Sequence, residues 1–395
     1  MSEIIPIGPY HPLQEEPEFF RLHVEGERVV KLDIEIGYNH RGIEKLAESK
    51  SWDQVVFLVE RICGICSTSH PAASVNAMED LGGIEAPERA QYIRTIIAEL
   101  ERVHSHLLWL GLAGHFTGYN TVWMWVWKYR EIICDIFEKI TGNRQSYAMF
   151  KVGGVRRDIL EEDIPWIKKY LSKLKPALDL FKGAVMDDPV IHARTKGVGV
   201  LTAKQAHDYG VVGPTARPSG LAIDVRKDNP YFAYDWVDWD IVVLQEGDVF
   251  AKVACRILEM YESVKIIEQC LDRMKPGIID LHVKELPPGE GIGRAEAPRG
   301  EVYHYCRSDG SNFPVRYKVR APSYMNIFSN EVACIGEHVA DAALILAAVD
   351  PCYCCTERIV VVDRDTKKER VLKGSELIRL SHERTEEIKK ELGVS

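Results

Sequence analysis

Two pairs of cysteines are the residues whose type and spacing bear most directly on chemistry. Cys63 and Cys66 form one C-x-x-C pair near the N-terminus, and Cys352 and Cys355 form another near the C-terminus. Four converging thiolates would make a soft site suited to zinc, an iron–sulfur cluster, nickel or copper(I). Because most of the chain lies between the two pairs, the whole fold must close to bring them together.

Three interpretations of these cysteines are open on spacing alone. A structural zinc site is the common meaning of two C-x-x-C pairs, but zinc ribbons usually separate the pairs by tens of residues. A buried redox or catalytic metal is equally supported, and the pairs could also be unrelated. Cys354 stands between the members of the second pair, and the C-x-x-C register favours Cys352 and Cys355 over it. The other five are isolated, and we expect them to be small buried hydrophobic residues: Cys134, Cys255, Cys270, Cys306 and Cys334.

The composition is that of an ordinary globular protein. The chain has 395 residues, of which 46% are hydrophobic and 28% charged, and its formal net charge is −9 at pH 7. Nucleic-acid binders usually carry an excess of lysine and arginine, so we predict no nucleic-acid partner. The first residues show no basic region followed by an apolar run, which predicts no signal peptide and a reducing compartment. There, clustered thiols hold metals more often than they form disulfides.

Hydrophobic periodicity predicts several long amphipathic helices. From residue 87 to about residue 110, apolar residues such as Ile93, Ile97 and Leu100 recur at intervals of three and four, as on the buried face of a helix. Further helices are expected at residues 123–140, 159–186, 247–274, 330–349 and 375–392. Looser patterns predict hairpins at 19–37 and 359–371, strands and loops at 276–325, and a loop at 197–224.

These elements predict a mostly helical α+β fold. A bundle of long helices would form the core, beside a small N-terminal β-hairpin region and short peripheral strands. No repeat or linker-like segment divides the chain, so we expect one domain spanning residues 1–395. Within it we distinguish a β region at 1–37, a helical body with loop and strand insertions at 38–350, and a C-terminal metal motif, hairpin and helix at 351–395.

One uncharged stretch is long enough to cross a bilayer. Residues 105–127 contain no Asp, Glu, Lys or Arg. The glycines and polar residues at 114–120, among them Gly114, Gly118 and Asn120, instead predict a break between two buried helices. We therefore expect no transmembrane helix.

The cysteine motifs resemble those of a known family. Residues 61–70 (RICGICSTSH) and 350–355 (DPCYCC) are similar to the two metal-binding signatures of nickel–iron hydrogenase large subunits. The resemblance covers nearly the whole chain through further short motifs in the same order. These resemble the energy-converting, membrane-bound hydrogenases and the related quinone-site subunit of respiratory complex I, and lie at residues 8–12, 15–17, 38–45, 153–158, 213–217 and 296–300.

The resemblance implies a nickel–iron centre whose iron carries two cyanide ligands and one carbon monoxide, Fe(CN)2CO. By position, Cys63 and Cys352 would be terminal nickel ligands, and Cys66 and Cys355 would bridge nickel and iron. Soft thiolate donors suit low-valent metals. The implied reaction is the reversible heterolytic cleavage of dihydrogen, which also covers the reduction of protons.

The resemblance also implies roles for residues around the metals. The Cys352 thiolate would act as the base and relay protons to Glu16, and Arg299 would project over the open metal face with Asp350 as its companion. His70 would hydrogen-bond next to the metal ligands, and Glu44 would help to bind a second ion, magnesium or iron. Without the resemblance, each would ordinarily be a solvated charge, a helix cap or a core histidine.

The sequence departs from the family pattern in two places. Well-studied members carry a histidine three residues beyond the last cysteine, where this chain has Arg358, which puts the second metal at Glu44 in doubt. Those chains also end at that histidine after proteolytic maturation, whereas this one continues to Ser395, as energy-converting members tend to do.

The resemblance implies partners as well. We expect an iron–sulfur small subunit that exchanges electrons with this chain, ferredoxin-like electron-transfer subunits, and antiporter-like membrane subunits that couple the reaction to ion translocation. The chain would be peripheral, on the cytoplasmic side of the cell membrane. Two alternatives stay open: a sulfane sulfur or quinone reductase subunit on the same scaffold, and a zinc-stabilised structural subunit.

Overall fold

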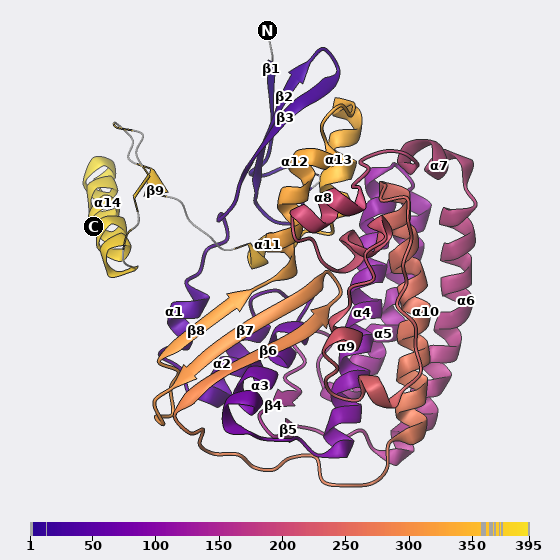
Figure 1. Ribbon diagram of the computed structural model, residues 1–395, viewed down its shortest axis with the longest axis vertical. Helices are drawn as coiled ribbons and strands as arrows, with labels where there is room; N and C mark the ends of the chain where they lie inside the picture. The colour runs from indigo at the N-terminus through magenta and orange to yellow at the C-terminus, as the bar shows by residue number, and fades with distance from the viewer. Residues whose placement is uncertain are drawn as a thin grey trace.

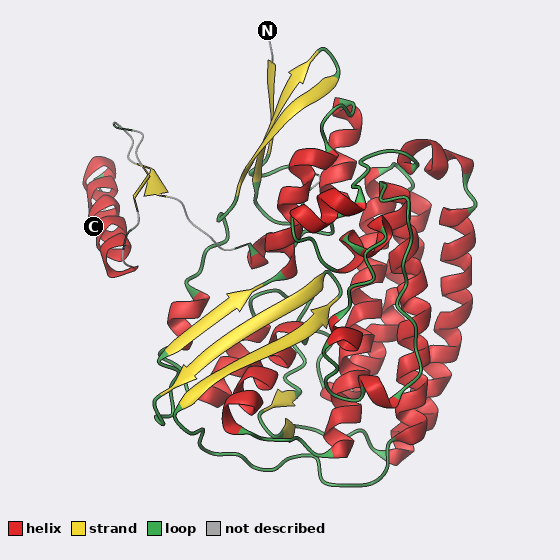
Figure 2. Ribbon diagram, viewed as in Figure 1, coloured by secondary structure: helices red, strands yellow, loops and turns green. Residues whose placement is uncertain are grey.

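The fold is described from a computed structural model, which covers residues 3–12, 14–356, 361–362, 366, 369–370, 372 and 374–393. Helices make up most of it, and its strands form small antiparallel sheets at the periphery (Figures 1 and 2). The predicted class, α+β and mostly α, is confirmed.

Four long helices form the predicted bundle. They are α4 (Glu88–Phe116), α5 (Asn120–Thr141), α6 (Ile164–Met186) and α10 (Val249–Arg273), and Figure 1 shows them side by side. α4 contacts both α5 and α10, which explains why its residues are buried almost all round and not on one stripe alone. All four were predicted, although α4 extends beyond residue 110 and α6 begins after a short 3-10 turn at Glu161–Asp163.

A three-stranded antiparallel sheet covers α3 (Ser69–Gly82). Its strands are β6 (Gly289–Ala297), β7 (Gly300–Ser308) and β8 (Arg316–Arg320), within the region where strands were predicted. Gly291 and Gly293 face α3 so closely that an added Cβ atom would lie 2.0 Å from a helix carbonyl oxygen at each position. These glycines let the strand rest directly on the helix. The contact matters because α3 begins just after the first cysteine pair.

A second small sheet lies at the N-terminus. β2 (Phe19–Glu25) and β3 (Arg28–Glu35) form the predicted hairpin, and β1 (Glu3–Ile7), which was not predicted, pairs with β2. Alternate residues of β2 point into a cluster shared with α12 (Asn330–Ala333) and α13 (Val339–Ala348). Figure 1 shows this sheet beside α12 and α13 at the top of the view. The segment between β1 and β2 carries Glu15 and Glu16.

Two sequence predictions were wrong in detail. The single helix expected at 330–349 is interrupted, because Gly336 adopts a φ of +83° between α12 and α13. The loop expected at 197–224 contains α8 (Ala203–Asp208), whose first turn is stabilised by a capping box between Thr202 and Gln205. The polar residues of this short helix had suggested a loop.

The uncharged stretch at 105–127 is broken as predicted. α4 ends at Phe116, Gly118 has a φ of +80°, and α5 starts at Asn120. Among the described residues, no helix combines the length and hydropathy that a bilayer crossing requires.

The remaining described elements lie outside the helix bundle and the two larger sheets. β9 (Val361–Val362) and β10 (Glu369–Arg370) pair as the predicted C-terminal hairpin, whose residues Ile359, Val360 and Val371 lie outside the described part of the chain. The predicted terminal helix is α14 (Gly374–Leu392). The others are α1 (Ile43–Ala47), α2 (Trp52–Glu60), α7 (Pro189–Thr195), α9 (Val225–Asp228), α11 (Pro322–Asn326), β4 (Phe150–Lys151) and β5 (Gly154–Val155).

Candidate metal centre

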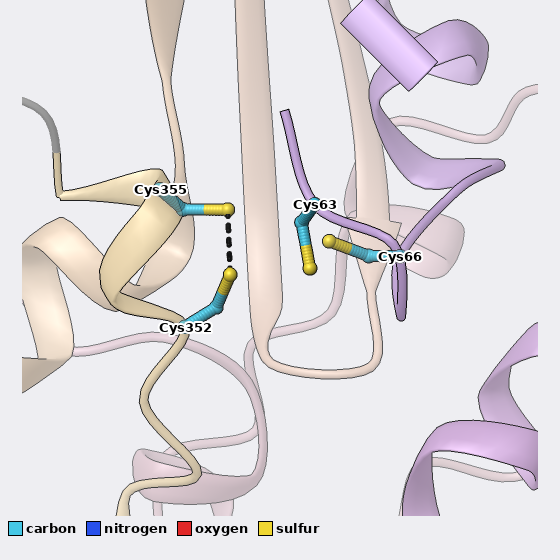
Figure 3. Close-up of side chains that lie close together, drawn as sticks. All are labelled: Cys63, Cys66, Cys352 and Cys355. Atoms are coloured by element: carbon cyan, nitrogen blue, oxygen red, sulfur yellow. Dashed lines mark hydrogen bonds between the residues drawn. The ribbon is translucent and has the colours of Figure 1, made fainter. Parts of the chain in front are cut away.

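The fold brings the two cysteine pairs together. The sulfur atoms of Cys63, Cys66, Cys352 and Cys355 all lie within 4.8 Å of one another, and within the described part of the chain this is the group of side chains arranged to hold a metal. Figure 3 shows the two pairs facing each other from opposite sides. The Cys352 and Cys355 sulfurs lie 3.1 Å apart. None forms a disulfide. Four thiols and no oxygen ligand make a donor set that fits nickel, iron or zinc.

The first pair lies in the loop between α2 and α3. Arg41 holds the approach to this loop, because its guanidinium donates to the carbonyl oxygens of Arg61 (2.9 Å) and Ile62 (2.7 Å). On the far side, the buried Glu101 carboxylate accepts the backbone N–H of Ser69 at 3.1 Å and that of Thr68. It thereby caps the first turn of α3, where unpaired amides favour an anion.

The second pair follows α13 in a 3-10 turn at Tyr353–Cys355. Asp350 starts this segment with a φ of +54°, a left-handed conformation that aspartate adopts more readily than most residues. The Cys352 N–H donates to Ser323 Oγ (3.0 Å), and the Cys354 N–H donates to the carboxylate of Glu16 (2.6 Å). Two backbone hydrogen bonds therefore fix the direction of the second pair.

The four thiols do not hold their protons equally. Hydrogen bonds from Cys352, Cys355 and Cys66 hold the pKa of Cys63 well below its usual range. The same cluster raises the pKa of Cys352, first through its hydrogen bond with Cys355. The thiols of the metal-free chain therefore titrate as one coupled group, as expected when four acidic groups crowd a buried space.

Arg299 and Asp350 lie together at the face of the cysteine cluster. Arg299 comes from the tight turn between β6 and β7, and its side chain forms an ion pair with Asp350 and donates to Ser105 Oγ at 3.2 Å. Burial alone would lower the pKa of Arg299, but the Asp350 carboxylate and the nearby thiols raise it well above its usual value. The guanidinium is therefore a permanent cation beside the thiols.

Two neighbouring glutamates approach the cluster. Glu16, predicted as the proton relay, binds the Cys354 backbone. Glu15 was not predicted, and part of its side chain is exposed. Burial of its carboxyl group among protein atoms, followed by the charge of Asp350, raises its pKa to about 8 against the opposing effect of Arg299. Both glutamates belong to the motif Glu15-Glu16-Pro17, but only Glu16 was predicted to act at the site.

His70 lies against the cluster, as its position in the first signature suggested. Its Nε2 is 3.5 Å from the Cys355 sulfur, and its Nδ1 is 3.0 Å from His304 Nε2. His304, on β7, was not singled out from the sequence. Both rings are buried, and burial lowers the pKa of His70 to about 4 and that of His304 well below its usual value. Both imidazoles are therefore neutral at physiological pH.

Glu44, the residue considered for a second metal, is engaged otherwise. Its two oxygens pair with Lys318 Nζ (2.7 Å) and accept the Val319 N–H (3.0 Å). It lines a cavity of about 170 Å³ that also reaches Cys354 and Cys355. Arg358, which replaces the expected histidine, lies outside the described residues. A carboxylate neutralised by lysine is a poor magnesium ligand, so these contacts do not support a second ion at Glu44.

A buried network of charges that the sequence did not reveal lies beyond Arg299. Arg217, fully buried, binds the carboxylates of Glu259 and Glu296 (both 2.8 Å) and lies 3.3 Å from Asp224. The motifs at 213–217 and 296–300 contain Arg217 and Glu296 without showing that the two meet, and neither motif contains Glu259 or Asp224. Arg256 extends the network towards the cluster, with its Nε 3.9 Å from Asp350 Oδ2.

Comparison with known proteins places this arrangement in a family. Residues 117–286 and 282–358 match the family described as the 49 Kd subunit of the respiratory-chain NADH dehydrogenase, and residues 41–112 match the family described as nickel-dependent hydrogenase. The chain belongs to the family of nickel–iron hydrogenase large subunits and complex I 49-kDa subunits. The resemblance expected from the cysteine signatures is therefore confirmed.

Relatives in this family differ in what they do. The chain is 41% identical to the membrane-bound hydrogenase subunit alpha of Pyrococcus furiosus, covering 97% of this chain and 93% of the relative. It is 37% identical to an NADH-quinone oxidoreductase subunit of Rhizobium etli, covering 88% and 93%. A solved structure of a membrane-bound sulfane sulfur reductase, an archaeal respiratory membrane complex, is 34% identical, with a TM-score of 0.86 over 90% of this chain and 98% of that one. The chain thus belongs to an oxidoreductase family and is similar to its energy-converting hydrogenase members.

Proposed function

We propose that this chain is the catalytic subunit of a membrane-associated, energy-converting hydrogenase. The observation that supports this most is the convergence of four thiols from both ends of the chain within 4.8 Å, beneath a buried arginine. When bound there, a nickel–iron centre supplies the chemistry of reversible dihydrogen cleavage. Cys63, Cys66, Cys352 and Cys355 would hold it.

The surrounding residues would handle charge and protons. Arg299, kept cationic by Asp350, offers a fixed positive charge at the face of the cluster, where charge develops during the reaction. The Glu16 carboxylate accepts the backbone N–H of Cys354, which lies between the two cysteines Cys352 and Cys355 in the sequence. We infer that it takes the proton that Cys352 accepts and passes it outward.

We propose that the partners are those of a coupled respiratory complex. An iron–sulfur small subunit would exchange electrons with the metals, with ferredoxin-like subunits beyond it and antiporter-like membrane subunits that translocate ions. This proposal rests on the relatives, which are subunits of multi-subunit membrane complexes. The chain would be bound peripherally on the cytoplasmic side.

The similarity to a sulfane sulfur reductase supports a second candidate. The cavity beside Cys354 and Cys355 offers room for a substrate larger than dihydrogen next to the cluster. The test is to assay the purified complex for both products. Hydrogen evolution without sulfide production supports the hydrogenase, whereas sulfide production from polysulfide without hydrogen evolution would refute it. Neither product, with stoichiometric zinc in native material, would indicate a structural subunit.

A further inference from the structure

Four buried side chains form a continuous chain of hydrogen bonds beside the cysteine cluster. His70 and Ser74 lie four residues apart on α3, and therefore on one face of that helix. Opposite them, His304 on β7 and Tyr317 on β8 lie diagonally across two paired strands, because Tyr317 pairs with Cys306 and side chains two positions apart share a face.

The contacts run from the metal ligand to the helix. The Cys355 sulfur lies 3.5 Å from His70 Nε2. His70 Nδ1 lies 3.0 Å from His304 Nε2, and His304 Nδ1 lies 2.7 Å from the Tyr317 hydroxyl oxygen. The Tyr317 hydroxyl in turn donates to Ser74 Oγ at 2.7 Å. At most 1% of each of these four side chains is exposed, so water does not compete for these bonds.

The two histidines constrain each other. A neutral imidazole has one N–H and one acceptor nitrogen, and here the Nδ1 of His70 meets the Nε2 of His304. One of these two atoms must donate and the other accept. Both rings must therefore carry the proton on the like-named nitrogen, either both on Nδ1 or both on Nε2.

Tyr317 selects between the two arrangements. Because its hydroxyl donates to Ser74, its oxygen is left to accept from His304 Nδ1–H. His304 Nε2 then accepts from His70 Nδ1–H, and His70 presents its Nε2 lone pair to the Cys355 sulfur. We propose that His304 and Tyr317 are positioning residues of the metal centre, which hold His70 in one tautomer and so determine whether it donates to or accepts from Cys355.

This inference deepens the proposed function, and it stands on the side-chain geometry of the metal-free chain. Outer partners of this kind commonly tune the residues that surround a metal. Its test uses the full metal-free chain with 15N-labelled histidine rings, in which two-bond proton–nitrogen correlations report which nitrogen carries the proton. His70→Gln and His304→Gln identify the two rings among the 13 histidines.

The expected spectrum shows Nδ1–H for both rings in the natural protein. Tyr317→Phe removes the acceptor from His304 Nδ1, so a proton there would be buried without a partner, and both rings should shift to Nε2–H. Ser74→Ala should cause the same shift for another reason, because the Tyr317 hydroxyl then turns to donate to His304. Neither variant removes a metal ligand.

Tyr147→Phe is the matched control. Tyr147 is also buried, and its hydroxyl has no hydrogen-bond partner among the described residues, so both tautomers should stay as they are. Unlike tautomers in the natural protein, or unchanged Nδ1–H signals in both Tyr317→Phe and Ser74→Ala, would overturn the proposal. These outcomes are independent of nickel content, so a failed hydrogenase assignment and a failed tautomer assignment can be told apart.

Discussion

Arg299 and Asp350 form a buried ion pair, with the guanidinium Nη2 2.7 Å from the carboxylate Oδ1 and the Arg299 Nε donating to the Asp350 carbonyl oxygen at 2.7 Å. The pair ties the turn between β6 and β7 to the segment that carries the second cysteine pair. A buried charge that loses its partner is far more costly than the pair itself is beneficial.

Arg299→Met should therefore destabilise the metal-free chain by about 3–5 kcal/mol. The double variant Arg299→Met/Asp350→Asn should recover part of this loss, because it removes the orphaned charge and asparagine tolerates the left-handed backbone at residue 350. Urea unfolding of the single and double variants measures the difference. A double variant no more stable than Arg299→Met would show that the Asp350 charge is not the cause.

Glu16→Gln should slow dihydrogen-dependent dye reduction by about 10²-fold or more, because the amide still accepts the Cys354 N–H but cannot carry a proton. Its metal content should stay unchanged. Glu15→Gln is the comparison, since it alters the neighbouring carboxyl group without touching that hydrogen bond. Full activity in Glu16→Gln, or an equal loss in both variants, would argue against the assigned relay.

The sequence predicted the two cysteine pairs of this site but not several of the residues that surround them, such as His304 and Arg217. The cysteine signatures are local patterns, and the long helices follow from periodicity, as Ile93, Ile97 and Leu100 show for α4. The strand β1 was not predicted, because it is short and contains Pro6. Proline is tolerated there because β1 lies at the edge of its sheet. The residues of β1 alone do not show that this segment pairs with β2.

The residues around the metals depend on tertiary pairing. His304 meets His70 only because β6 rests on α3 through its glycines, and no spacing in the sequence predicts that approach. Arg217 likewise stands in a short motif, whereas its carboxylate partners come from α10 and β6. Such contacts follow from the packing of whole elements, which periodicity does not determine.

Arg217→Met should be severely destabilising, by about 3–5 kcal/mol or more, because it leaves buried carboxylates unpaired. Arg144 provides a matched control: it also contacts three carboxylates, on Glu131, Asp135 and Glu138, but its side chain is 42% exposed. Arg144→Met should therefore change stability by less than about 1 kcal/mol. Comparable losses in the two variants would contradict this account of burial.

Lys252 should make stability depend on pH in the alkaline range. Lys252 is 1% exposed, and its Nζ lies 3.2 Å from the Gly199 carbonyl oxygen. Burial, followed by the charge of Arg256, lowers its pKa to about 8. Between pH 8 and the unfolded value of 10.5, the unfolded state binds more protons than the folded state. The contribution of Lys252 to the free energy of unfolding should therefore rise with pH across that window.

Lys252→Met should accordingly be more stable than the natural protein at pH 7, by about 3 kcal/mol, and this advantage should shrink as the pH rises from 8 to 10.5. Unfolding curves of both proteins across that range provide the measurement. An advantage that stays constant with pH would show that Lys252 is not buried as a charge.

The proposed function requires both cysteine pairs to hold one nickel–iron centre. The most direct measurement is metal analysis with infrared spectroscopy on the matured complex, for the natural chain, Cys63→Ser, Cys352→Ser and the control Cys134→Ser at an isolated buried cysteine. We expect equal amounts of nickel and iron with cyanide and carbonyl stretches in the natural chain and the control, and their loss in both ligand variants. Zinc in place of nickel, or nickel retained in both ligand variants, would contradict the account.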